Sequence, residues 1–234
     1  MTDTARLKLP VIAAAQAQKH VTHNEALALL DAFVQLAVVS RAAAAPPGSP
    51  AEGDCYIVPA GATAAWSGWE LAVAVFSGGG WIRLDPPEGT RAYVKDERGV
   101  VVFADGLWRN GMAFTAHGGC VALRAKEEEL TLSGAFVETA DAAFIADRAI
   151  VLGVASRTTA AIAGAASYSV GIASDTTKFG NLLGIAAGST NVGVIGPTAY
   201  YADTRVRVTA NGGGFTGGKV RLIVYSMEMA APLN

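Results

Sequence analysis

The second half of the chain consists of short apolar runs that glycine interrupts at regular intervals. Between Val121 and Asn234 these runs include AIVLGVAS, AAIAGAASYSVGIAS, FGNLLGIAAGS, NVGVIG and KVRLIVYSM. Such runs are typical of β-strands, and their spacing from Leu130 to Val224 predicts about eight strands. Two packed sheets in a jelly-roll-like β-sandwich accommodate that number. The stretch contains no histidine, cysteine or tryptophan, which favours a binding or structural protein over an enzyme.

Composition limits the classes of function open to the chain. Of its 234 residues, 51% are hydrophobic and 16% are charged, a balance that supports a packed core and argues against disorder. The net charge is −2 and no Lys/Arg cluster exceeds RVR or KVR, so no nucleic acid partner is expected. No signal sequence and no apolar run of about 20 residues is present, so no membrane insertion is expected. We therefore expect synthesis in the cytoplasm and, for any extracellular role, release by lysis or inside a particle.

Residues 1–45 predict a helical segment. The stretch 11–41 follows Pro10, lacks glycine and proline, and carries apolar residues at spacings of three, four and seven. A helix this apolar must pack on another domain or associate with copies of itself, and we favour self-association. The expected helix spans residues 10–41 and serves as an anchor and oligomerisation segment.

The centre of the chain predicts a small β module at residues 46–111. It follows a linker, AAAAPPGSPAEGD (42–54), and its strand candidates are CYIV, WELAVAVF, WIRL, RAYV, GVVVFA and LW. Four tryptophans fall in this module, and we interpret them as its core, with a sugar-stacking platform as the alternative; they are Trp66, Trp69, Trp81 and Trp108. A connector over 112–128 is expected to join the module to the C-terminal sandwich of residues 129–234.

Groups suited to catalysis or metal binding are sparse. Cys55 and Cys120 lack metal-like spacing and are interpreted as buried or half-buried thiols. His20 and His23 share a helical spacing of three, but solvated or interface histidines explain them better than a metal site. Carboxylates of the C-terminal half lie mostly in turns, where capping or solvation is their usual role. We expect no catalytic residue, no metal and no cofactor.

A glycan site is the most plausible site in the C-terminal half. Sugar recognition requires an aromatic face beside hydroxyl, amide and carboxylate groups that match sugar hydroxyls. The segment PTAYYADTR supplies these groups, and other strands add polar residues that could converge on it. The predicted ligand-binding residues are Tyr168, Asp175, Asn191, Tyr200, Tyr201, Asp203 and Arg205. Because successive strand residues point to opposite faces, one of the two adjacent tyrosines is expected to lie in the core.

Three blocks of residues resemble a known family. They are LKLPVIAAAQAQKHVTHNEALALLDAFVQLAV, PPGSPAEGDCYIV and DPPEGTRAYVKDERGVVVFADGLW. These blocks are similar to alphaproteobacterial phage tail-fibre-like proteins and to head-spike proteins of gene transfer agents, which are phage-like DNA-carrying particles. The resemblance covers about residues 6–110, and the segment beginning IVLGVAS is also similar to the end of such proteins. Cys55 departs from it, since a larger polar or basic residue is expected there.

The resemblance implies a structural subunit of a released, virion-like particle. It implies a homotrimer whose distal β domain contacts the host envelope or capsular polysaccharide, and it carries over no catalytic residue. Other spike or capsid proteins would be partners through the N-terminal helix. Two alternatives stay open: a capsule-degrading glycoside hydrolase, which needs paired carboxylates in one groove, and a structural collar or connector without a ligand.

Overall fold

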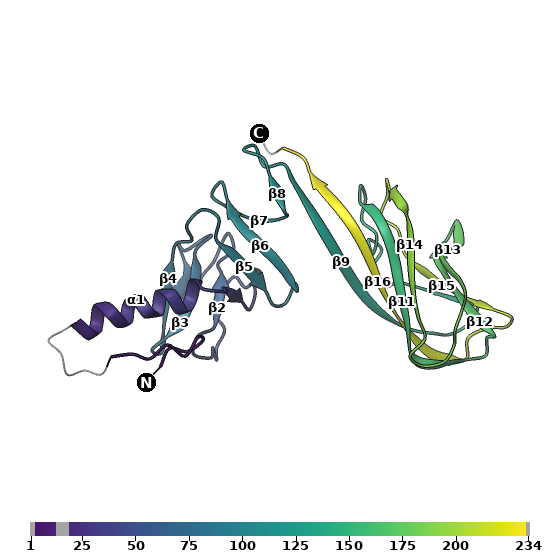
Figure 1. The fold of residues 1–234 in the computed structure, drawn as a ribbon, viewed down its shortest axis with the longest axis horizontal. Coiled ribbons are helices and arrows are strands. Elements are labelled where there is room, and N and C mark those ends of the chain that lie inside the picture. Colours follow the sequence, from purple (N-terminus) through teal and green to yellow (C-terminus); the bar gives the residue numbers. More distant parts are fainter. Residues whose placement is uncertain (1–2, 13–18, 233–234) are drawn as a thin grey trace. The chain divides into compact units, whose positions relative to one another are not determined.

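The computed structural model describes residues 3–12 and 19–232, and the chain divides into two compact units (Figure 1). Unit 1 comprises residues 1–116 and unit 2 comprises residues 117–234. The described residues are mainly β, with one α-helix, α1 (Lys19–Phe33), and one short 3-10 turn, η1 (Ala64–Trp66). This confirms the predicted fold class. Among the described residues, no helix has the length and apolarity needed to cross a membrane.

The described part of unit 1 contains two small sheets. One has the order β2-β3-β4 and is antiparallel, with β2 (Cys55–Ile57), β3 (Val73–Ser77) and β4 (Gly80–Leu84). The other has the order β1-β5-β6-β7, with β1 (Ala37–Val38), β5 (Arg91–Val94), β6 (Gly99–Ala104) and β7 (Leu107–Asn110). Strand β1 runs parallel to β5, and β8 (Ala113–Phe114) lies near the end of the unit. Each strand candidate predicted between residues 55 and 108 contains a strand, although WELAVAVF is strand only from Val73 onward.

Helix α1 is shorter than predicted and belongs to the core of unit 1. Ala32 and Leu36 are buried in the same cluster as Val38 and Cys55. The helix ends at Phe33 because the chain turns and then pairs as β1 with β5. The expected continuation to residue 41 is therefore wrong, and the part of the prediction covering residues 13–18 lies outside the described residues.

The predicted boundaries around the helix also need correction. Residues 42–54 are irregular, as a linker would be, but they do not separate two domains. Val38 and Cys55, on either side of this segment, lie in one hydrophobic cluster, and the backbone N–H of Val39 donates to the carbonyl of Cys55 at 2.8 Å. The helical segment 1–45 and the module 46–111 are thus parts of one unit.

The tryptophans of unit 1 contribute to its core. Trp66 is fully buried and its ring meets that of Trp81 edge-on, with 4.9 Å between the ring centroids. Trp69 packs half-buried against the same cluster, and the indole N–H of Trp108 donates to the Leu71 carbonyl at 2.8 Å. The interpretation of these residues as core is confirmed, and none of the four presents a fully open ring as a sugar platform.

Unit 2 is an eight-stranded sandwich of two antiparallel sheets (Figure 1). Its strands are β9 (Cys120–Thr131), β10 (Phe136–Glu138), β11 (Ile150–Ala163), β12 (Ser167–Ile172), β13 (Asp175–Leu183), β14 (Thr190–Ala199), β15 (Arg207–Asn211) and β16 (Gly217–Ala230). Within the unit, one sheet has the order β14-β11-β16-β9 and the other β10-β15-β12-β13. In chain order, the first sheet therefore holds the first, eighth, third and sixth strands and the second sheet holds the rest. This is the jelly-roll arrangement of two interleaved Greek keys.

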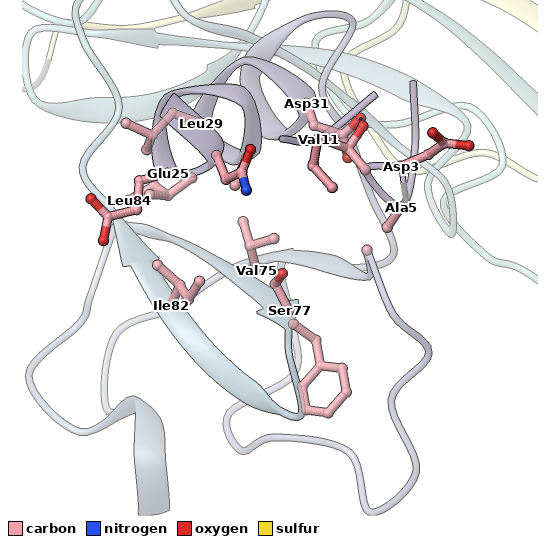
Figure 2. A pocket seen from close by; sticks show the side chains of 15 residues that line it. Asp3, Ala5, Val11, Glu25, Leu29, Asp31, Val75, Ser77, Ile82 and Leu84 are labelled. Atoms are coloured by element: carbon pink, nitrogen blue, oxygen red, sulfur yellow. Dashed lines mark hydrogen bonds between the residues drawn. The ribbon is translucent and has the colours of Figure 1, made fainter. Parts of the chain in front are cut away.

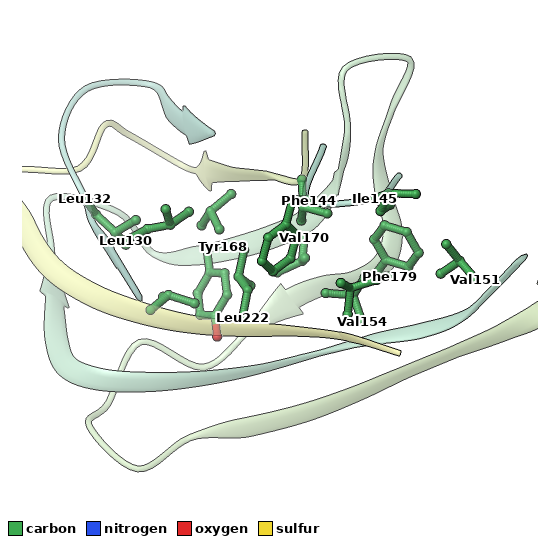
Figure 3. Close-up of a cluster of buried hydrophobic side chains, with 14 of the residues drawn as sticks. Leu130, Leu132, Phe144, Ile145, Val151, Val154, Tyr168, Val170, Phe179 and Leu222 are labelled. Carbon is green, nitrogen blue, oxygen red and sulfur yellow. The ribbon is translucent and has the colours of Figure 1, made fainter. Parts of the chain in front are cut away.

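The two sheets enclose a continuous apolar core (Figure 3). Leu130 and Leu222 come from the first sheet, Tyr168 and Phe179 come from the second, and Phe144 enters from the β10–β11 loop. Full burial of each such side chain stabilises the fold by about 1.5–3 kcal/mol, and unit 2 thus has a hydrophobic core of its own.

The predicted connector over 112–128 is wrong. Most of its second half belongs to β9, which pairs with β16 from Cys120↔Ala230 to Thr131↔Lys219. The sandwich thus begins before residue 129, because β9 is the first strand of the jelly roll.

Candidate functional site

Two of the predicted glycan-binding residues serve the interior of the sandwich. Tyr168 is 1% exposed, and its hydroxyl accepts a hydrogen bond from the Thr158 hydroxyl at 3.3 Å. The Asn191 side-chain amide donates to the Phe179 carbonyl at 2.9 Å. The assignment of Tyr168 to a binding site is wrong, because its ring fills the core and cannot reach a ligand. The amide of Asn191 holds β14 to β13 instead of facing the other candidates.

Arg205 and Tyr200 also have structural roles. The guanidinium of Arg205 donates to the carbonyls of Thr139 and Ala140, which fastens the start of the β10–β11 loop. Tyr200 is buried, and its hydroxyl has no hydrogen-bond partner among the described residues. Burial and, to a lesser extent, the negative charge of Asp175 raise the pKa of Tyr200. Tyr201 is 83% exposed, so the expectation that one of the two adjacent tyrosines lies in the core is confirmed.

The exposed candidates, which are Asp175, Tyr201 and Asp203, lie at one end of the sandwich, which we call the loop end. It consists of the β10–β11 loop (139–149), the β12–β13 turn (173–174) and the β14–β15 loop (200–206). Asp203 accepts a hydrogen bond from the backbone N–H of Asp147 at 2.9 Å, and the N–H of Arg148 donates to the Tyr200 carbonyl at 2.7 Å. These bonds hold the two long loops together, and the exposed Tyr201 belongs to the second of them.

Sequence reasoning missed two charged residues of the loop end. Asp147 and Arg148 form an ion pair with 3.6 Å between carboxylate and guanidinium, and the Arg148 side chain is 84% exposed. They lie more than fifty residues before Asp203 in the chain, and nothing in the sequence pattern indicates that the two loops meet. The jelly-roll connections bring them together, because the β10–β11 and β14–β15 loops lie at the same end of the fold.

A polar groove of about 320 Å³ runs along the same β10–β11 loop. Its charged walls are Arg124 and Glu228, whose side chains are 3.3 Å apart, and Lys126. The Lys126 ammonium pairs with Asp141, donates to the Ala143 carbonyl at 2.8 Å and lies 6.0 Å from the centre of the Phe144 ring. Alanines and Val224 line the remainder. The groove thus combines both signs of charge with one aromatic wall.

The carboxyl groups with shifted pKa values do not suit general acid catalysis. A glycoside hydrolase requires one carboxyl group whose pKa is raised above its usual range. Hydrogen bonds from Lys126 and from the backbone of Ala143 instead lower the pKa of Asp141. The nearby Thr159 hydroxyl and the hydrogen bonds from Lys219 and Arg221 lower the pKa of Glu129.

The cysteines offer no reactive thiolate site. Both are free; Cys55 is buried and Cys120 is half-buried, as interpreted from the sequence. Burial raises the pKa of the Cys55 thiol to about 11, which keeps it protonated near neutral pH. Among the described residues, no three histidine, cysteine or acidic side chains group closely enough to hold a metal ion.

Unit 1 contains a larger cavity of about 550 Å³ (Figure 2). Its walls come from the N-terminal segment, α1 and the β3–β4 hairpin, and include Val11, Leu29, Val75, Ile82 and Leu84. Asp31 also lines it, but its carboxylate already accepts hydrogen bonds from Thr4, Arg6 and Leu7. Asp3, Glu25 and Ser77 also line the cavity, so it combines mainly apolar surface with a few polar groups.

Comparisons with known proteins give limited matches. Residues 23–109 match the family model described as "Protein of unknown function (DUF2793)". Among solved structures, a chain of the "Cyanophage Pam1 capsid asymmetric unit" is similar, with 19% identity and a TM-score of 0.36. That match covers 51% of this chain and 93% of the other. No curated protein matches. The family match lies within unit 1, and it includes most of α1 together with all the strands from β1 to β6.

Proposed function

We propose that the protein is a non-enzymatic structural subunit of a phage-like particle that binds a host surface polysaccharide through the loop end of unit 2. The grouping of the exposed Tyr201 ring with Asp203, Asp147 and Arg148 carries this proposal. An open aromatic face beside hydrogen-bonding charges is the combination that sugar recognition requires. The adjacent groove along the β10–β11 loop provides room for further sugar units.

The finer assignment is a head-spike or tail-fibre subunit of a gene transfer agent. It rests on the similarity of residues 6–110 to such proteins. The host ligand would be capsular polysaccharide, bound during adsorption. A homotrimer would repeat a weak sugar site three times, and linked weak sites gain greatly in avidity.

Helix α1 is proposed to contact other spike or capsid proteins of the particle. The helix buries Ala32 in unit 1 but leaves Leu29 and Leu30 about half exposed, with Val34 exposed just beyond its end. Apolar side chains that recur at this spacing form a continuous stripe, which is the surface that a helix offers to a partner.

Binding to capsulated and capsule-free host cells tests the proposal. The full-length protein should bind only capsulated cells, and Tyr201→Ala should weaken each site by about 1–2 kcal/mol, or about five- to thirty-fold in Kd. Tyr93→Ala, which removes a half-exposed tyrosine from unit 1, is the matched control and should bind normally. Equal binding to both cell types would reject capsular polysaccharide as the ligand. Release of reducing sugar from the capsule would favour a depolymerase. Absence of binding to either cell type would favour a structural collar without a ligand.

A further inference from the structure

The outward face of the sheet β14-β11-β16-β9 carries apolar side chains where a solvated sheet carries polar ones. Val192 and Val194 on β14 are 70% and 76% exposed, and Leu123 on β9 and Met229 on β16 are 59% and 63% exposed. Tyr225 on β16 is 40% exposed. We call these five residues the apolar face. Contiguous exposed apolar surface on a folded domain marks an interaction site.

A shallow hollow of about 230 Å³ lies in the apolar face. It is lined by the side chains of Leu152, Val192, Val194 and Tyr225 around Gly153. Gly153 stands between Val194 and Tyr225 in the strand registers, and a Cβ there would lie 2.6 Å from the Gly193 carbonyl oxygen. The close approach of two strands thus excludes a side chain at the centre, and this leaves room for one from a partner.

Charged residues border the apolar face at one height along the strand direction, which we call a level. Arg157, Arg221 and Glu129 are cross-strand neighbours on β11, β16 and β9. Arg221 pairs with Glu129 at 2.9 Å, and the Glu127 carboxylate, two residues along β9, is 4.0 Å from Arg221. Arg157 is exposed and has no ion-pair partner among the described residues. One side of the face therefore carries an unpaired cation, while β9, on the other side, carries two carboxylates.

We infer that a second copy of this chain covers the apolar face, with the copies related by a rotation axis parallel to the strands. Such a rotation leaves the level along the strands unchanged, so it brings Arg157 of one copy to the level of Glu129 of its neighbour. Glu127 is two residues, about 7 Å, farther along β9, and the long arginine side chain can span that distance. It also joins apolar surface to apolar surface. A single chain supplies both halves of this charge pairing, which favours a second copy over a different protein. The inference deepens the proposed function, because it locates the contact between copies that a homotrimer requires.

Light scattering or sedimentation of the full-length protein tests the contact. Val192→Glu/Val194→Glu places two charges on the apolar face and should raise the concentration for half-dissociation at least about tenfold. Both side chains are largely exposed, so circular dichroism should report an unchanged fold. Leu182→Glu, at a 73% exposed position in the other sheet, should leave association unchanged. A wild-type monomer at micromolar concentration, or a double variant that associates like the wild type, overturns the inference.

A charge reversal tests the proposed pairing. Arg157→Glu and Glu127→Arg should each weaken association, and the two changes together should restore it, because the reversed charges attract across the interface. Within one chain, Arg157 on β11 and Glu127 on β9 are separated by β16. Restored association would therefore not be explained by a direct ion pair within one chain. Failure of rescue, with both single variants folded, overturns the pairing.

Cell binding by the same samples separates this inference from the proposed function. Dissociation of the variants together with absent wild-type binding to capsulated cells would support the interface and reject the ligand. If the protein binds capsulated cells but its association is unaffected by all these substitutions, the polysaccharide ligand is supported and the proposed interface is rejected. If another particle protein protects the apolar face from labelling while the purified chain stays monomeric, the occupant is that protein and the inference is wrong.

Discussion

Asp31 shows how a single residue fixes the N-terminal part of unit 1. It is a buried carboxylate on α1 that accepts hydrogen bonds from the Thr4 hydroxyl at 2.7 Å and from the backbone N–H groups of Arg6, at 2.9 Å, and Leu7. The Arg6 guanidinium in turn donates to the carbonyls of Asp31, Ala32 and Gln35. A cation at the last carbonyls of a helix also interacts favourably with its dipole. One side chain thereby joins residues 4–7 to the end of α1.

Asp31→Asn should destabilise unit 1 by about 3 kcal/mol, because hydrogen bonds to a charged acceptor are lost and an amide donor meets backbone donors. Urea unfolding followed by tryptophan fluorescence measures this loss, since all four tryptophans lie in unit 1. Asp85→Asn is the control, because its exposed pair with Arg83 contributes little. An unchanged transition for Asp31→Asn would show that the network contributes little to stability.

The pH dependence of unit 1 should follow the same carboxylate. Burial alone would raise the pKa of Asp31, but hydrogen bonds from Leu7, Thr4 and Arg6 outweigh it and hold the pKa below the ordinary value. A lowered folded-state pKa means that the stabilisation is present above about pH 4 and is lost as the pH falls through the folded-state pKa. The wild type should therefore lose more stability than Asp31→Asn on acidification. Parallel pH curves for the two proteins would contradict this.

Tyr200→Phe should leave unit 2 equally stable or stabilise it by about 1 kcal/mol, because the buried hydroxyl has no partner among the described residues. The ring, which fills the core, is retained. Thermal unfolding followed by circular dichroism measures the effect, with Tyr201→Phe as the exposed control. A loss of more than about 1 kcal/mol would indicate that the hydroxyl does have a hydrogen-bond partner, such as an ordered water.

At the scale of elements, the sequence predicts strands well where apolar and polar residues alternate regularly. It fails where tertiary contacts place polar residues on the inward side of a strand and apolar residues on the outward side. Along β9, the outward residues include Leu123, while the inward residues include Arg124 and Lys126, which face the polar groove instead of the core. Because of this inversion, the sequence of β9 resembles that of a charged connector, and most of the strand falls within the predicted connector 112–128. The predicted helix was too long for a related reason. Leu36, just before β1, and Val38, within β1, are apolar because they are buried in the core of unit 1, and their composition does not distinguish a strand from a helix.

The candidate site was less predictable than the fold. The sequence identified Tyr201 and Asp203 because they are adjacent to a strand and carry suitable groups. It could not identify Asp147 and Arg148, since their proximity depends on the connection pattern of the jelly roll. It also assigned Tyr168 to the site, because a polar aromatic in a polar segment looks exposed until the facing sheet covers it.

Deletion of residues 1–45 should unfold unit 1 and leave unit 2 folded. The deletion removes Ala32, Leu36 and Val38 from a buried cluster and strand β1 from its sheet, so the remaining core is open to water. Burial lost at these sites amounts to several kcal/mol, roughly the stability of a small domain. Tryptophan emission should shift to longer wavelength without any denaturant. Native-like emission from the truncated protein would mean that residues 46–116 fold without α1.

At the scale of the whole molecule, the two units divide the proposed roles. Unit 1 offers an apolar helix stripe and no open aromatic among its tryptophans, whereas unit 2 has an exposed tyrosine, a polar groove and an apolar sheet face. Attachment to a particle and recognition of a ligand can therefore be carried by separate units, each with its own core. This division makes each role testable in a fragment.

Polysaccharide binding should be found in isolated residues 117–234 and be absent from isolated residues 1–116. The fragments must be divided here, because a cut at residue 129 would remove most of β9 and expose the sandwich core. Unit 2 contains nine Lys and Arg residues and nine Asp and Glu residues, so its binding should change little between low and high salt. Titration of purified capsule into each fragment by calorimetry, at two salt concentrations, measures both properties. Binding by residues 1–116 alone would move the site to unit 1, and a steep fall in affinity with salt would indicate that an acidic polymer is held mainly by Arg124, Lys126 and Arg148.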